Sequence, residues 1–113
     1  MSGISTHILD ISRGHPAAGV LVTLERQEGE GWRRVTTQST DVDGRVKQLL
    51  PQQELLQSSQ YRLTFHTQSY FDAQDVAGLY PVVQITITVT DIAGHYHIPL
   101  LLTANGYSTY RGS

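Results

Sequence analysis

Alternation of apolar and polar residues is the dominant pattern of this chain, and it predicts β-strands. It is clearest in VVQITITVT, 82–90, where from position 83 apolar residues alternate with Gln and Thr. A period of two in β-branched residues is typical of a half-buried strand. The same pattern predicts strands over 61–66 and 19–26. The side chains expected to face the core from these three segments are Val20, Val22, Leu24, Tyr61, Leu63, Phe65, Val83, Ile85, Ile87 and Val89.

Two further strands are expected in the first part of the chain. Segment 32–39, WRRVTTQS, follows the glycine-containing loop QEGEG and is expected to form a hairpin with 19–26. Segment 5–11, STHILDI, is a shorter strand in which both sides carry apolar residues. Its alternation therefore does not decide which side His7 faces.

The last two strands carry the most unusual outer face. HYHIPLLL, 95–102, places large side chains on one face, Tyr96, Ile98, Leu100 and Leu102. The opposite face carries His95, His97 and Pro99, so His97 is expected to point away from the core. Proline has no N–H to donate, and this predicts an edge or irregular position at Pro99. Asn105-Gly106 predicts a type I′ turn that folds the last segment back as a strand.

Helix is scarce in this pattern. Segment 51–59, PQQELLQSS, and segment 69–77, SYFDAQDVA, are short candidates. Six or more short strands separated by glycine-containing turns are typical of an antiparallel β-sandwich. With 113 residues, the chain is expected to form one domain over 1–113.

Composition narrows the function classes. The formal net charge is −2 and the eight Lys and Arg are spread thinly, which argues against a nucleic-acid surface. The absence of cysteine excludes disulfides, thiolate metal sites and cysteine nucleophiles. No apolar run reaches membrane-spanning length. The N-terminus lacks the features of a secretory signal, so we expect a cytoplasmic protein, with the periplasm as the alternative if a leader was removed.

Histidines are the first candidates for chemistry. His15 and His66 are interpreted as ordinary surface or structural residues, which is the usual role of a lone histidine. His95 and His97 share a strand face, with Cα atoms about 6.6–7 Å apart. This spacing occurs in zinc sites, with His7 as a third ligand, but no carboxylate or thiolate lies nearby in the sequence. We therefore expect no metal.

Arg45 ends the segment DVDGR, 41–45, which is interpreted as a turn leading into a short strand. The later carboxylate of a calcium loop is missing at the required spacing. An arginine here is ordinarily solvated, but in a pocket its planar donors could grip a ligand rich in carbonyl groups. The chain has neither a G-x-S-x-G elbow nor a phosphate-binding glycine loop.

Four segments, in this order along the chain, resemble the transthyretin-related proteins, and among them the 5-hydroxyisourate hydrolases. They are HILDISRGHPAAGVLVTLER (7–26), DVDGR (41–45), HYHIPLLL (95–102) and GYSTYRGS (106–113). The final Tyr-Arg-Gly-Ser resembles the tetrapeptide that marks the hydrolases. The transthyretin carriers lack this ending and the histidines at these positions.

The resemblance implies a fold and an assembly. It implies a transthyretin-like β-sandwich of two four-stranded sheets with one short helix. It also implies a homotetramer built as a dimer of dimers, with active sites in a channel where the dimers meet. The outer faces of the first strand and of the last two strands would line this channel, which would place His7 there together with Ser108, Tyr110 and Gly112.

The resemblance also implies residue roles. Catalytic roles fall on His7, Arg45, His97 and Ser113. Substrate-binding roles fall on His7, Arg45, Tyr110, Arg111 and Gly112. His95 matches a family position but is not expected to be catalytic.

The implied reaction is hydrolysis of 5-hydroxyisourate to 2-oxo-4-hydroxy-4-carboxy-5-ureidoimidazoline in urate catabolism. Histidine suits the base role because its ordinary pKa is about 6.5. We hypothesise that His7 and His97 together orient and deprotonate the water, and that Arg45 binds the heterocycle. No cofactor is implied, and the expected partners are the substrate and other copies of the chain, with no nucleic acid or membrane. The alternatives are a transthyretin-like small-molecule carrier and a structural sandwich module of an adhesin.

Overall fold

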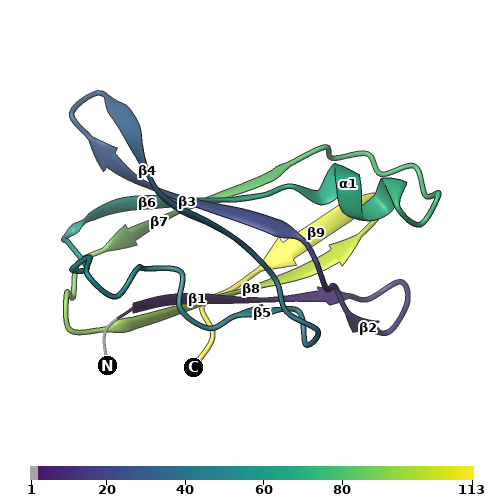
Figure 1. Cartoon of the computed structure of the whole chain (residues 1–113), viewed down its shortest axis with the longest axis horizontal. Helices are drawn as coiled ribbons and strands as arrows, with labels where there is room; N and C mark the ends of the chain where they lie inside the picture. Colours follow the sequence, from purple (N-terminus) through teal and green to yellow (C-terminus); the bar gives the residue numbers. More distant parts are fainter. Residues whose placement is uncertain (1–2) are drawn as a thin grey trace.

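Two β-sheets packed face to face form the architecture in Figure 1, which shows a computed structural model describing residues 3–113. One sheet has the order β2-β1-β8-β9, with β5 also paired to β1. The other has the order β4-β3-β6-β7. The strands are β1 (Gly3–Asp10), β2 (His15–Pro16), β3 (Leu21–Glu28), β4 (Gly31–Ser39), β5 (Arg45–Val46), β6 (Ser59–Phe65), β7 (Val83–Val89), β8 (His95–Thr103) and β9 (Gly106–Thr109). The transthyretin-like sandwich expected from the sequence is confirmed, with β5 as a fifth strand in the first sheet.

The core lies between the two sheets and consists of the residues that the alternation places inward. All the inward residues predicted from segments 19–26, 61–66 and 95–102 are buried. On β1 the even positions face the core, since Ile4 and Ile8 are fully buried. Ile85 and Ile87 are only partly buried, because β7 is the outer strand of its sheet.

The pairing of β1 with β8 departs from the antiparallel pattern expected for the whole sandwich. These two strands run parallel, in a register from Gly3 opposite His95 to Asp10 opposite Leu102. Every other named strand pair within residues 3–113 is antiparallel. The parallel register sets Ser5 beside His97 and His7 beside Pro99 on the outer face.

Pro99 was expected at an edge or irregular position, and only the irregularity is confirmed. Strand β8 lies between β1 and β9, so it is not an edge strand. Its ladder with β9 stops at Leu100 opposite Thr109 and resumes as a single bridge between His97 and Gly112. Pro99 lies in this gap because it has no N–H to contribute. The Thr109 hydroxyl instead donates to the Pro99 carbonyl at 2.6 Å.

The turn between β8 and β9 differs from the type I′ turn predicted at Asn105-Gly106. Thr103 pairs with Gly106, so the two loop residues are Ala104 and Asn105. Neither these residues nor Gly106 has a positive φ, and a type I′ turn requires one at both central positions. The Thr103 side chain holds the turn instead. Its oxygen accepts from the Asn105 N–H at 3.3 Å, and its hydroxyl donates to the Gly106 carbonyl at 3.1 Å.

A short helix, α1 (Thr67–Asp72), connects β6 to β7 and starts two residues before the predicted segment 69–77. It is tied to the end of β1, since the Tyr70 hydroxyl donates to Asp10 Oδ2 at 2.7 Å. Burial and this hydrogen bond raise the pKa of Tyr70 to about 12.

The other segment predicted as a possible helix, 51–59, forms a turn instead. The Glu54 N–H donates to the Pro51 carbonyl and closes this turn. Within residues 3–113 there is no helix of the length and apolarity needed to span a membrane.

The DVDGR turn is fixed against β1, and this places Arg45. Asp41 Oδ1 accepts from the backbone N–H groups of Asp43 at 2.9 Å and Arg45 at 3.0 Å. The Arg45 hydrogen bond is the main reason that the pKa of Asp41 is lowered. Gly44 has a φ of 75° and its carbonyl accepts from the Ile8 N–H at 2.8 Å. A Cβ at Gly44 would lie 2.5 Å from the Ile8 carbonyl oxygen.

We expect Gly44→Ala to destabilise the protein more than Gly14→Ala. Both glycines have a positive φ, of 75° and 73°, so both variants carry the left-handed backbone penalty of about 1–2 kcal/mol. Only Gly44 also meets backbone, whereas a Cβ at Gly14 has nothing within 4 Å. The extra cost of overpacking is about 1–3 kcal/mol. Urea denaturation of the two variants measures the difference, and equal midpoints would show that the contact with β1 does not require glycine.

Candidate active site

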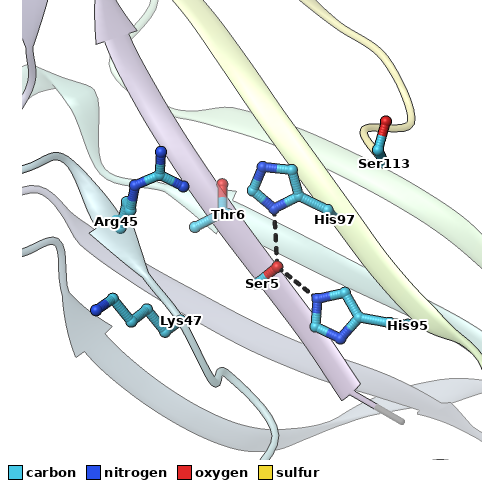
Figure 2. Close-up of a pocket in the computed structure, with 7 residues that line it drawn as sticks. All are labelled: Ser5, Thr6, Arg45, Lys47, His95, His97 and Ser113. Carbon is cyan, nitrogen blue, oxygen red and sulfur yellow. Dashed lines mark hydrogen bonds between the residues drawn. The ribbon is translucent and has the colours of Figure 1, made fainter. Parts of the chain in front are cut away.

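A pocket opens on the outer face of the five-stranded sheet, where β1, β5 and β8 meet the end of the chain. Figure 2 shows the seven residues that line it, drawn from segments far apart in the sequence. They are Ser5, Thr6, Arg45, Lys47, His95, His97 and Ser113. The position agrees with the prediction that His97 points away from the core.

Strand pairing brings these residues together. The parallel register sets Ser5 opposite His97, and the β1–β5 register sets His7 opposite Arg45. His95 precedes His97 by two positions, so both imidazoles leave the same face of β8. The site therefore requires β1 as the common neighbour of β5 and β8.

Ser5 contacts both imidazoles of the pocket. Its hydroxyl oxygen lies 2.8 Å from His97 Nδ1 and 2.9 Å from His95 Nε2 (Figure 2). Ser5 is buried, whereas His97 is half-buried and His95 is exposed. The second ring nitrogen of His97, Nε2, has no hydrogen-bond partner among the described residues and is turned away from Ser5 (Figure 2).

The electrostatics of the pocket keep His97 neutral. Burial lowers the pKa of His97 below its ordinary value of 6.5, and the positive fields of Arg45, His7 and His95 lower it further. An imidazole with a lowered pKa is uncharged at pH 7 and has a nitrogen lone pair available. His97 can therefore accept a proton from a water molecule held in the pocket.

Positive charge dominates the rest of the lining. Arg45 and Lys47 both lie at the pocket, and the set of lining residues includes no Asp or Glu. Such a pocket favours a ligand that is anionic or rich in carbonyl oxygen, since Arg and Lys side chains only donate hydrogen bonds. It also favours a reaction in which negative charge develops on an oxygen atom.

The C-terminal tail packs directly on His97. The Gly112 N–H donates to the His97 carbonyl at 2.8 Å. A Cβ at Gly112 would lie 2.5 Å from Cδ2 of the His97 ring and 3.3 Å from Cγ of Pro99. Glycine is thus required for the tail to approach the ring this closely. The same approach brings the next residue, Ser113, into the pocket.

Most of the residues assigned to the site from the sequence lie in this pocket or directly beside it. Arg45, His97 and Ser113 line the pocket. His7 lies outside the lining set but next to it, paired with Arg45 on one side and Pro99 on the other. Gly112 supports the His97 ring.

Tyr110 and Arg111 lie in a different cavity of the same chain, one lined from β7, β8 and the end of β9. The Arg111 guanidinium stacks on the Tyr96 ring, with Cζ 4.3 Å from the ring centre. It also donates to the His95 carbonyl at 3.4 Å. Tyr110 was expected to share the face of the sheet that carries His97. Within one chain, however, it does not reach the pocket that contains His97.

Sequence reasoning did not select Ser5, Thr6 or Lys47, and it set His95 aside as not catalytic. Ser5 shares strand parity with His7, and Lys47 shares it with Arg45, so a weak signal was present. The decisive information is the pairing of β1 with β8, which no local pattern contains. Within residues 3–113, no cluster of three metal-ligating side chains is found, although His7, His95 and His97 were considered as a zinc set.

Comparisons with known proteins agree with this architecture. The model of the HIUase/Transthyretin family matches residues 4–112. The 5-hydroxyisourate hydrolase of Salmonella dublin is 42% identical over 110 residues, covering 97% of this chain and 80% of that protein. The 5-hydroxyisourate hydrolase of Deinococcus radiodurans is 46% identical over 114 residues, covering 98% of this chain and 96% of that protein.

Solved structures give the same result. The 5-hydroxyisourate hydrolase of Klebsiella pneumoniae has a TM-score of 0.87 at 37% identity, and each chain is covered completely. Sea bream transthyretin in complex with thyroxine has a TM-score of 0.89 at 26% identity, covering 96% of this chain and 93% of that one. On the family match over residues 4–112 and on relatives above 40% identity along nearly the whole sequence, this chain belongs to the HIUase/Transthyretin family.

Proposed function

We propose that this chain is a hydrolase that opens the cyclic amide of 5-hydroxyisourate. The observation that carries the proposal is the meeting of a neutral His97, Arg45 and Ser113 in one pocket whose lining includes no Asp or Glu side chain. The full-length relatives named 5-hydroxyisourate hydrolase favour this function over the carrier that the sequence left as an alternative. A carrier also has no need for a neutral base beside two cations.

In the first step, hydrogen-bond donors of the pocket hold the substrate. Arg45 offers a planar set of N–H groups to the carbonyl oxygens of the heterocycle. His97 Nε2 accepts a proton from water while the water oxygen attacks the amide carbon. His7, beside Arg45, helps to orient this water. The negative charge that develops on the carbonyl oxygen is stabilised by the Arg45 guanidinium.

In the second step the ring opens, and the proton that His97 took from water passes to the substrate. The C–N bond breaks, and the His97 imidazolium gives its proton to the leaving nitrogen, so His97 is neutral again. The new carboxyl group ionises and lies in a pocket that contains Arg45 and Lys47. Ser113 and the tail shape the pocket. Every step uses side chains of this chain and one water molecule.

We also propose that four copies assemble as a dimer of dimers through the outer face of the five-stranded sheet. Leu9 and Leu101 are cross-strand neighbours on this face and remain partly exposed in one chain. Tyr110 is 57% exposed beside the same sheet. Packing of a second copy would cover these apolar groups and close the pocket, and it would let Tyr110 and Arg111 reach substrate as the resemblance implies.

Freshly generated 5-hydroxyisourate should decay faster with the protein than in buffer, as followed by ultraviolet absorbance. We expect the rate to survive prolonged dialysis against a chelator, because no proposed step uses a metal. Binding of 5-hydroxyisourate without any faster decay would support the carrier and contradict the hydrolase. Loss of the rate on chelation would instead support the zinc alternative.

His97→Asn should lower kcat by about 10²- to 10⁴-fold, the usual contribution of a general base. His15→Asn is the matched control, because His15 is exposed and lies outside the pocket. Burial lowers the pKa of His97 below its ordinary value of 6.5, so wild-type kcat/KM should fall as pH decreases, with a midpoint below pH 6.5, because His97 becomes protonated. Native mass spectrometry should give four copies for both variants. An unchanged kcat would remove His97 from the mechanism, and a monomer would contradict the assembly.

Gly112→Ala should reduce kcat by about 10-fold or more, because the added methyl displaces the His97 ring and misplacement by about 1 Å can cost 10²-fold. Gly106→Ala in the same hairpin is the control, since its nearest neighbour to a Cβ is 3.7 Å away and its φ is not positive. Steady-state kinetics and urea denaturation should show a kinetic loss that exceeds the loss of stability. Equal kinetics for the two variants would mean that the tail does not position His97.

A further inference from the structure

The Ser5 hydroxyl lies between the two imidazoles of the pocket and touches both. We propose that Ser5 is a positioning residue that fixes His97 in the tautomer with a proton on Nδ1 and a lone pair on Nε2. This assignment rests on the proposed hydrolase function, in which Nε2 receives the proton of water. Neither family resemblance nor residue pattern assigned a role to Ser5.

The hydrogen bonds of Ser5 are protected and their geometry is good. Ser5 is 7% exposed, so bulk water has little access to its oxygen. The distances of 2.8 Å to His97 Nδ1 and 2.9 Å to His95 Nε2 are those of normal hydrogen bonds. Backbone pairing of β1 with β8 holds Ser5 at this point, independently of the side chains.

The protons in the two hydrogen bonds of Ser5, His95 and His97 can be arranged in two ways. A hydroxyl has one proton, so Ser5 can donate to one imidazole and must accept from the other. In the first arrangement, His97 Nδ1–H donates to Ser5 and Ser5 donates to His95 Nε2. In the second, His95 Nε2–H donates to Ser5 and Ser5 donates to His97 Nδ1. The first leaves a lone pair on His97 Nε2, whereas the second leaves an N–H there.

The charges in the pocket favour the first arrangement. His97 Nε2 is turned away from Ser5, on the side of the pocket where the Arg45 guanidinium lies (Figure 2). A guanidinium only donates hydrogen bonds and is always charged, so its field stabilises a lone pair and destabilises an N–H that faces it. Lys47 adds positive charge to the same pocket. The other end of the trio, His95, is exposed and can present its N–H to solvent.

The same arrangement survives the catalytic step. When Nε2 accepts the proton of water, His97 becomes an imidazolium whose Nδ1–H still donates to Ser5. The hydrogen bond to Ser5 therefore holds the ring before and after proton transfer, without moving another atom. A third group that fixes the tautomer of a histidine base is an established way to make it effective. Without Ser5, the Nδ1–H of His97 loses its acceptor, so the ring is no longer held and its preference for the reactive tautomer weakens.

Tautomers of His97 can be read directly from ¹⁵N chemical shifts of the folded wild-type protein above pH 7, with His97→Asn used for assignment. We expect a protonated Nδ1 and an unprotonated Nε2. A wild-type spectrum with the proton on Nε2 would overturn the proposal, whatever the kinetics show. This measurement needs no substrate, so it remains decisive if the wild-type protein fails to hydrolyse 5-hydroxyisourate, a result that would overturn the proposed function alone.

Kinetics of Ser5 variants supply the second test. Ser5→Ala should lower kcat by about 10- to 100-fold with KM nearly unchanged, and should increase the fraction of His97 that carries its proton on Nε2. Ser5→Thr retains a hydroxyl and should recover most of kcat and the wild-type tautomer. Ser58→Ala is the control, because Ser58 is exposed just before β6, a strand of the other sheet, and lies outside the pocket. A folded Ser5→Ala variant with wild-type kcat, or a Ser5→Thr variant with a Nδ1-protonated ring but no recovery of kcat, would refute the positioning role.

Discussion

The parallel pairing of β1 with β8 is the contact on which the candidate site depends. It sets Ser5 beside His97 and leaves the other edge of β1 free for β5, which carries Arg45 opposite His7. Three segments separated by tens of residues thus meet on one sheet face. A shift of the pairing by one residue would turn every outer side chain of β1 inward. The burial of Ile4 and Ile8 under the second sheet prevents that shift.

Two close approaches of backbone, each made at a glycine, complete the pocket. Gly44 lets the turn before Arg45 rest on the Ile8 carbonyl, and Gly112 lets the tail rest on the His97 ring. Pro99 contributes by interrupting the β8–β9 ladder, so that the tail rejoins β8 only at His97. These contacts turn a flat sheet face into a lined cavity. They also hold the residues after β9 next to a candidate base.

The chemistry of the site follows from placing a half-buried imidazole among cations. Burial and neighbouring positive charge lower the pKa of His97, and in the proposed mechanism the same positive charge stabilises an oxyanion. One electrostatic environment therefore supports both the base and the transition state. The fold is shared with a sea bream transthyretin that was solved in complex with thyroxine, so the fold alone does not select the activity. The activity depends instead on the side chains on the outer face of the five-stranded sheet.

Local sequence patterns determined much of this protein, because alternation along a strand records which face is buried. They predicted the core residues of β3, β6 and β8, the outward direction of His97 and the turn before Arg45. The motifs that resemble the family pointed to His97, Arg45 and Ser113. Alternation cannot report which strands pair or in which direction, because that depends on contacts between residues far apart in the chain. Only the tertiary structure therefore decided the parallel β1–β8 register, the place of Ser5 between two histidines, and the distance of Tyr110 from the pocket.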